Sequence, residues 1–416
     1  MARLAHLPPH PGAVFIQEKD AMTEDPYPRF SAQEMARRHG LARKLMEEQG
    51  LDCLLFCAMS GTNRNNQANI YYLTGYRDFN HSFLVLPLKG EPSLFVGLYN
   101  HLHNAQAMAA ISDVRHGGYG NPEKVAARLG ELGLGRARIG LVGVNPRFGM
   151  GLFEGHMAFL KEKFPEARWV DASARFRDLR IVKSGEEIAW LREGARLTDL
   201  AMEALQANAR PGVAEYELSG RMAGAYAVEG GETLVQFVTA TPMASPHTPL
   251  PWQNPTRRRL QAGDIIHTEI SAAYYGYAGQ ILRPFTVGAD PAPPYRRLFD
   301  AAIEVFHDVA KAMRAGAPVG DVLAATGSLP RKGLRIYDSL AHGFGVDLLQ
   351  PSIGIPGSGY AVPPADFRYQ ENMVMVIQPN PVDEAGRGLQ VGDLGVVTRE
   401  GFQTLHRFPL AFPRCG

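Results

Sequence analysis

The stretch from Gly263 to Gly288, GDIIHTEISAAYYGYAGQILRPFTVG, restricts the fold of this chain more than any other feature. It is rich in β-branched and aromatic residues, so it predicts strands rather than a helix. Two strand-like runs follow, MVMVIQP at 373–379 and GDLGVVT at 392–398, and one helical passage, PPYRRLFDAAIEVFHDVAKAM, lies between. This order is typical of an α+β domain and not of a dinucleotide-binding fold with regular alternation.

The part of the chain before Arg180 has a different pattern. A helical period begins at Ser31. Strand-like runs come after it, at 51–57, 69–75 (NIYYLTG), 82–87 and 92–98. Helix and strand then alternate through ARIGLVG to about Val170. The pattern predicts a small α/β domain.

Chain length, the Pro-rich polar start and a helix N-cap together predict the domain boundaries. A chain of 416 residues is too long for one ordinary core. We expect an N-terminal arm over 1–28, which is rich in Pro and polar residues, an α/β domain over 29–172, and the α+β domain over 173–416. Ser184 is the expected N-cap of the helix that opens the last domain.

Composition excludes several classes of function. A net charge of +1 gives no electrostatic basis for binding nucleic acid or an anionic membrane. No apolar run approaches the ~18 residues that a spanning helix needs, and no signal peptide is visible at the start. The 3 cysteines suggest a reduced, cytoplasmic protein without disulfides. The Gly343-Phe-Gly345 segment lacks the context of a phosphate-binding loop.

Several motifs occur in one fixed order: NIYYLTGY, LRIVKSGEEIAWLREGARLTDLAM, the 263–288 stretch, AHGFG, MVMVIQP and GDLGVVTREG. This order resembles the creatinase, prolidase and aminopeptidase P family, over roughly residues 30–412. The resemblance implies a creatinase-type N-terminal α/β domain and an α+β C-terminal domain of the "pita-bread" fold. It also implies a homodimer.

Metallopeptidases of that family bind two divalent ions through two Asp, one His and two Glu. The positions that correspond to these ligands hold, in order, Glu269, Gln280, His342, Gln378 and Gly392. Two assisting histidines of the family correspond to Trp252 and Leu349. The chain therefore resembles the family but lacks most of its metal ligands.

The physical consequence is a site that we expect to hold no metal and no other cofactor. Hard divalent cations need several anionic oxygens, and catalytic zinc usually has three protein ligands. If the register slips by one residue, Asp393 restores a ligand and leaves a single-metal site open. Glutamines in place of carboxylates keep a polar pocket suited to a neutral or zwitterionic molecule. The alternative is drift that merely relieves repulsion between carboxylates.

Three residues are the candidates for proton transfer. Glu269 lies in an apolar strand, where burial raises a carboxyl pKa toward neutrality. His342 lies between a strand and two glycines, and His267 shares a strand face with Glu269. The alternative for each is structural: an acid paired with an arginine, or a histidine that only donates a hydrogen bond.

The expected binding residues surround these three. They are Gln280, Gln378, Trp252, His247 and Arg283. Core packing is the alternative for Trp252, an ordinary surface loop for His247, and a brace between strands for Arg283. Creatinase-like dimers send side chains from the loop after NIYYLTG into the partner's pocket, which here favours Phe79 and His81, or else an ordinary hairpin.

The preferred function is a metal-independent creatinase-like hydrolase that cleaves a C–N bond in a small nitrogen-containing molecule. A lyase can use the same base. The sequence also leaves open a non-catalytic pseudo-peptidase that only binds, and an atypical Xaa-Pro metallopeptidase with one ion. The residues that correspond to creatinase's catalytic His and to a substrate-binding Glu are Trp252 and Leu282, which argues against creatine as substrate.

Overall fold

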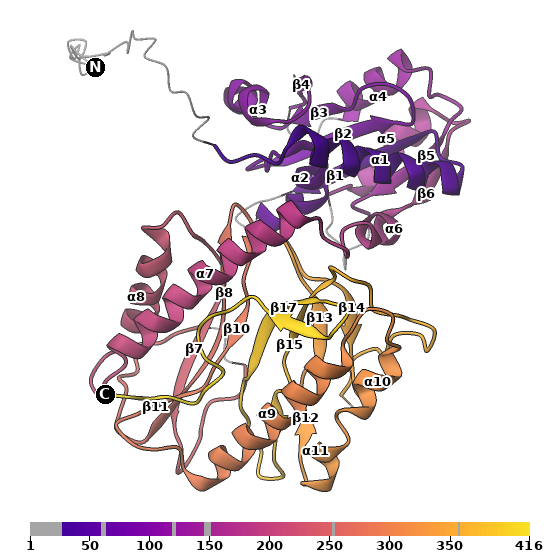
Figure 1. Ribbon diagram of the computed structural model, residues 1–416. Coiled ribbons are helices and arrows are strands. Elements are labelled where there is room, and N and C mark those ends of the chain that lie inside the picture. The colour runs from indigo at the N-terminus through magenta and orange to yellow at the C-terminus, as the bar shows by residue number, and fades with distance from the viewer. Residues whose placement is uncertain (1–26, 60–63, 119–121, 145–150, 252–253, 357) are drawn as a thin grey trace, which may run out of the picture.

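Figure 1 shows the computed structural model, which describes residues 27–59, 64–118, 122–144, 151–251, 254–356 and 358–416. The chain forms an α/β domain followed by an α+β domain, so both predicted fold classes are confirmed. The expected N-terminal arm lies almost entirely outside the described residues.

The first domain is built on a six-stranded sheet in the order β4-β3-β2-β1-β5-β6. Its strands are β1 (Cys53–Met59), β2 (His81–Pro87), β3 (Ser93–Val96), β4 (Asp113–His116), β5 (Arg138–Val142) and β6 (Arg168–Asp171). Its α-helices are α1 (Ala32–Gln49), α2 (Ala68–Thr74), α3 (Leu102–Met108), α4 (Pro122–Glu131), α5 (Glu154–Lys163) and α6 (Ser173–Asp178). Alternate residues of β1 pack on opposite layers, Leu54 and Phe56 with α1 and α2, Leu55 and Cys57 with α4 and α5.

The NIYYLTG segment is a helix and not the predicted strand. It forms most of α2, whose seven residues are all buried, and Gly75 ends it in the left-handed conformation at φ 68°. Aromatic and β-branched residues favour strands only weakly, and burial on every side removes the polar positions that reveal a helical period. The packing around this segment therefore determines that it is a helix and not a strand.

The first domain also extends beyond the predicted boundary at residue 172. Phe176 of α6 lies in the core of this domain, with its ring 4.7 Å from the ring of Phe56 and 6.2 Å from that of Tyr72. We therefore place α6 in the first domain.

The second domain contains an eleven-stranded sheet whose main path is β14-β13-β15-β17-β10-β8-β11-β19. Its long strands are β7 (Glu232–Pro242), β8 (Asp264–Tyr274), β14 (Leu349–Ile353) and β17 (Gly392–Val397). Its short strands are β9 (Tyr277–Ala278), β10 (Ile281–Leu282), β11 (Phe285–Val287), β13 (Ala341–Gly343), β15 (Val374–Ile377), β18 (Phe402–Thr404) and β19 (Arg414–Cys415). The strands β12 (Arg335–Ile336) and β16 (Pro381–Val382) pair with each other in a separate two-stranded sheet. Its helices are α7 (Gly185–Asn208), α8 (Glu215–Ala227), α9 (Pro293–Ala312), α10 (Val319–Ala324) and α11 (Ser328–Arg331).

Helices cover the two halves of this sheet separately, as Figure 1 shows. Leu205 of α7 and Leu218 of α8 pack with Ile270 of β8, and Val305 of α9 packs with Ala341 of β13. The neighbouring residues Glu269 and His342 therefore project from the opposite face of their strands. Ser184 caps α7 as predicted, and it forms a reciprocal capping box with Glu187.

A buried cluster of charged side chains joins the two domains. Arg38 of α1 is 0% exposed, and its Nε donates to Glu34 at 2.7 Å. Its Nη2 lies 3.6 Å from Glu187 of α7 and donates to the Tyr277 hydroxyl at 3.2 Å. We call these four residues the junction cluster.

Two expectations from composition concern the membrane and the thiols. Within the ranges that the structure describes, every helix is too short or too polar to cross a bilayer. Cys53, Cys57 and Cys415 are all buried free thiols.

Candidate active site

Strand pairing brings the predicted polar residues together in the middle of the large sheet. Glu269 of β8 lies opposite Leu282 of β10, and His342 of β13 lies opposite Val376 of β15. Gln280 directly precedes β10, and Gln378 directly follows β15. The N–H of Gln378 donates to the carbonyl of Leu340 at 2.8 Å, which fixes it beside β13.

The Glu269 carboxylate is held by two buried amides. Gln280 Nε2 donates to Oε1 at 3.0 Å, and Gln390 Nε2 donates to Oε2 at 3.2 Å. Burial and, to a smaller extent, the charge of Asp338 raise the pKa of Glu269 to about 7, although the hydrogen bond from Gln390 acts to lower it. Glu269 therefore exchanges protons near neutral pH.

Asp338 is a second carboxylate in this site, and sequence reasoning missed it. Gln378 Nε2 donates to Asp338 Oδ2 at 3.0 Å, and Asn380 Nδ2 reaches the same oxygen at 3.4 Å. The backbone N–H of Ser339 donates to Oδ1 at 2.7 Å. The sequence feature that could have identified it is an Asp shortly before His342. It was missed because this position does not correspond to a metal ligand of the family. We call Glu269, Asp338, His342 and the four amides Gln280, Gln378, Asn380 and Gln390 the acid–amide site.

Both predicted histidines are buried. Burial lowers the pKa of His342, while the carbonyl of Gly343 and the charge of Asp338 act to raise it. His342 Nδ1 lies 3.2 Å from that carbonyl, which makes Nδ1 the protonated nitrogen of the neutral ring. Burial lowers the pKa of His267 to about 3, and its Nδ1 has no hydrogen-bond partner among the described residues. His267 is thus a much weaker base than Glu269.

Two tyrosines lie next to the acids. The charge of Asp338 is the main cause that raises the pKa of Tyr360, and Glu269 adds to it. Burial, followed by the charges of Asp338 and Glu269, raises the pKa of Tyr337 well above its ordinary value. Both phenols stay protonated at neutral pH, and the Tyr337 hydroxyl is buried without a hydrogen-bond partner in the part of the chain that is described.

The donor set does not fit a pair of divalent metal ions. The hypothesis that Asp393 supplies a ligand is wrong, because its carboxylate accepts from Arg283 Nη2 at 2.6 Å and from the Thr404 hydroxyl at 3.2 Å. A Cβ at Gly392 would lie 2.5 Å from the carbonyl oxygen of Ile377 and 3.0 Å from Gln378 Cβ. No group of three His, Cys, Asp or Glu side chains with metal-binding geometry occurs in the described residues.

Arg283 is a structural brace, so its prediction as a binding residue is wrong. It is 0% exposed, and besides Asp393 its guanidinium donates to the carbonyls of Gly392 at 2.7 Å and Pro409 at 2.9 Å. These bonds tie β10 to β17 and to the C-terminal segment.

The prediction of His81 as a residue that reaches a partner subunit is also wrong. His81 is 3% exposed, its Nε2 bonds the Gly151 carbonyl at 2.7 Å, and its ring packs 4.5 Å from that of Phe83. Phe79, by contrast, is 57% exposed. Its N–H donates to Asp78 Oδ1 at 2.7 Å, so a tight turn presents the phenyl ring to solvent.

The remaining predicted residues lie on the loop after β7. His247 is exposed, and its backbone N–H donates to the Thr241 hydroxyl at 2.9 Å. Leu250 of this loop lies near Gly388, two residues from Gln390. Trp252 lies outside the described residues.

Comparison with known proteins gives two family matches and a set of relatives. The model of metallopeptidase family M24 matches residues 189–399, and that of the creatinase/prolidase N-terminal domain matches residues 38–182. A creatinase from a Bacillus species is 23% identical over 92% of both chains. The Xaa-Pro dipeptidase of Lactobacillus helveticus is 25% identical over 60% of this chain and 66% of its own.

Solved structures with the same fold cover nearly the whole chain. A Xaa-Pro dipeptidase from Bacillus anthracis matches with a TM-score of 0.74 and 21% identity over 91% of this chain and 99% of its own. An X-Pro aminopeptidase from Thermotoga maritima gives a TM-score of 0.75 and 18% identity over 90% of this chain and 99% of its own. At these identities the likeness shows the fold alone.

Proposed function

This chain belongs to metallopeptidase family M24, and from that premise we propose that it is a metal-independent hydrolase of a C–N bond in a small, positively charged or zwitterionic nitrogen compound. The observation that carries the proposal is the acid–amide site. Two carboxylates, Glu269 and Asp338, share a partly buried space there, and neutral amides rather than cations or metal ligands hold them.

The charge of the site supports a cationic group in the substrate. Buried carboxylates without a compensating cation are costly, and a positively charged nitrogen between Glu269 and Asp338 removes that cost. The rings of Tyr337 and Tyr360 add aromatic surface beside the acids. Gln378 Oε1, which has no partner in the described chain, can accept an N–H of the substrate.

Glu269 is the proposed catalytic base. Arrival of a cation next to it favours its ionised form, so the substrate itself converts Glu269 to the base. The carboxylate takes a proton from water while the water oxygen bonds to the substrate carbon. The C–N bond then breaks as that proton passes, directly or through His342, to the leaving nitrogen. Water is the only co-reactant, and the products are a carbonyl compound and an amine.

The test is turnover by protein purified without chelator and then treated with EDTA. A panel of small amides, ureas and amidines is assayed for release of ammonia or amine in water enriched in oxygen-18. The proposal predicts activity that survives EDTA and one heavy oxygen in the carbonyl product. Roughly one bound metal ion per chain, with activity lost in EDTA and on Xaa-Pro peptides only, contradicts it.

A lyase that uses the same base is the second candidate. Glu269 then removes a proton from carbon, and the nitrogen leaves as a double bond forms. The observation that favours it is the buried Glu269 with a pKa of about 7, which suits either reaction. An unsaturated product without heavy oxygen identifies the lyase. Tight binding without any product would instead indicate a module that only binds.

We also propose a homodimer in which Phe79 enters the partner's site. Its support is the exposure of Phe79 on the turn between α2 and β2. Light scattering measures the dimer directly. Phe79→Ala is expected to raise KM and leave the dimer intact, and a variant with unchanged KM contradicts the role of this side chain.

A further inference from the structure

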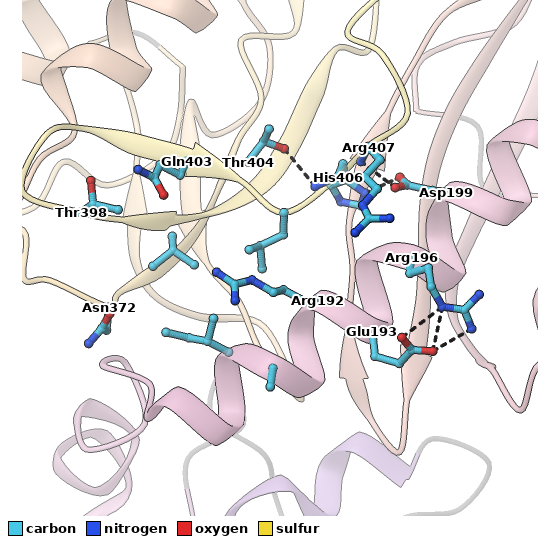
Figure 2. A pocket seen from close by; sticks show the side chains of 14 residues that line it. Arg192, Glu193, Arg196, Asp199, Asn372, Thr398, Gln403, Thr404, His406 and Arg407 are labelled. Atoms are coloured by element: carbon cyan, nitrogen blue, oxygen red, sulfur yellow. Dashed lines mark hydrogen bonds and ion pairs between the residues drawn. The ribbon is translucent and has the colours of Figure 1, made fainter.

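A cavity of about 490 Å³ lies between α7 and the β17–β18 hairpin. Figure 2 shows its polar side chains, which include Arg192 and Asp199 from α7 and Gln403, Thr404, His406 and Arg407 from the other wall. It shares no lining residue with the acid–amide site. We call it the arginine cavity.

The arginine cavity carries uncompensated positive charge. Arg196 pairs with Glu193 at 2.7 Å, and Figure 2 shows that pair at one side. The guanidinium groups of Arg192 and Arg407 have no carboxylate partner in the described chain, and both side chains are exposed. Arg192 extends from α7 toward the wall that carries Thr398 and Gln403 (Figure 2). Two unpaired guanidiniums on one cavity favour an anion.

An ordered Asp–His pair forms the back of the arginine cavity. Asp199 Oδ1 lies 2.7 Å from His406 Nδ1, and the side chain of His406 is 0% exposed. Asp199 Oδ2 accepts the backbone N–H of Arg407 at 2.7 Å, so one carboxylate orients both residues. His406 Nε2 is buried and has no hydrogen-bond partner among the described residues. This orphan nitrogen is a second sign of a missing ligand.

We propose that the arginine cavity binds a phosphate-type oxyanion, held by Arg192 and Arg407 with a further donor from the Gln403 amide. The planar guanidinium matches the spacing of phosphate oxygens and can bind two of them at once. The volume leaves room for an organic substituent on the anion. This site lies outside the proposed chemistry and does not depend on it.

The test is calorimetric titration of the whole protein with inorganic phosphate, at constant ionic strength set with chloride. Arg192→Gln and Arg407→Gln are each expected to weaken binding by about tenfold. Arg168→Gln is the matched control, because Arg168 is exposed on the first domain and has no ion pair within the described chain. Phosphate that binds no more tightly than chloride, or equally to the wild type and both cavity variants, overturns the proposal.

Discussion

The junction cluster is buried and the acid–amide site contains two partly buried carboxylates, and the two groups differ in what neutralises their acids. At the junction, Arg38 lies between the carboxylates of Glu34 and Glu187, and all three are less than 5% exposed. At the acid–amide site, the hydrogen bonds that Glu269 and Asp338 accept within the described chain come from neutral groups, namely side-chain amides, the Ser339 N–H and the Tyr360 hydroxyl. At the junction, Arg38 and the partly exposed Arg37 together balance the two carboxylates, whereas no cation within the described chain pairs with Glu269 or Asp338.

This difference suggests that the junction cluster stabilises the fold and that the acid–amide site serves the proposed function. A buried ion pair whose partners all come from the chain stabilises one geometry, and removing one partner leaves an uncompensated charge. Carboxylates held by amides keep their orientation while their charge stays available to a ligand. Substitutions at the two clusters should therefore affect different quantities: folding at the junction, turnover and binding at the site.

The largest expected effect is on turnover. Glu269→Gln keeps the size of the side chain but removes the base, so kcat should fall about 100-fold to 10,000-fold. The thermal midpoint should stay the same or rise, because the change removes an uncompensated carboxylate. Steady-state assays and differential scanning calorimetry on the same preparation measure both. Turnover close to wild type would show that Glu269 is not the base.

At the junction the effect should appear in folding. Arg38→Met leaves Glu34 and Glu187 with only Arg37, and the free energy of unfolding should fall by about 3 kcal/mol. Arg37→Met is the matched control: Arg37 pairs with the same two acids but is 36% exposed, so its loss should cost about 1 kcal/mol or less. Urea unfolding measures both. Equal losses in the two variants would contradict the distinction drawn between the clusters.

Because the pKa of Glu269 is raised in the folded protein, the free energy of unfolding should depend on pH. Its pKa is about 7 in the folded protein against an ordinary value of 4.5, so the folded state holds the proton more tightly. The stabilisation is complete below about pH 4.5 and is lost as the pH rises through about 7. Between those limits stability should fall by roughly 2 kcal/mol in the wild type, and Glu269→Gln should abolish that slope. Urea unfolding midpoints measured between about pH 4.5 and about pH 7 test this prediction. If Glu269→Gln keeps the dependence of stability on pH, another group causes it.

The smallest effect concerns Asp338. Asp338→Asn keeps an acceptor oxygen for Gln378 but removes the charge that attracts a cationic substrate. KM for such a substrate should rise about tenfold with little change in kcat, since Asn cannot form the charge-assisted contact. A neutral substrate analogue should show no such change. An unchanged KM for the cation would mean that Asp338 does not contact the substrate.

The fold was largely predictable because its signals are local and ordered. The 263–288 stretch, the Ser184 cap and the successive strand motifs each specify an element, and their order specifies the architecture. NIYYLTG failed because a fully buried helix shows no polar face. A uniform apolar run does not distinguish helix from strand.

The site was less predictable because its residues were identified only by their correspondence to the metal-ligand positions of the family. That correspondence singled out Glu269, Gln280 and Gln378, and the structure shows Gln280 bonded to Glu269 and Gln378 bonded to Asp338. Asp338 and Gln390 are not ligand positions, so nothing in the spacing identified them. Arg283 and Asp393 were each considered alone, and only the structure shows that they pair at 2.6 Å.

The tight packing at Gly392 bears on how such a site can change over time. Gln378 and the Ile377 carbonyl occupy the space that a side chain at 392 would need. A single substitution that restores an acid at position 392 therefore meets a steric barrier before it can gain a ligand. The backbone at 377–378 must move first, and that step brings no benefit while position 392 lacks a ligand group. A metal ligand at position 392 is thus blocked in either order of substitution, so the backbone packing at this point restricts the site to its present acid and amide groups.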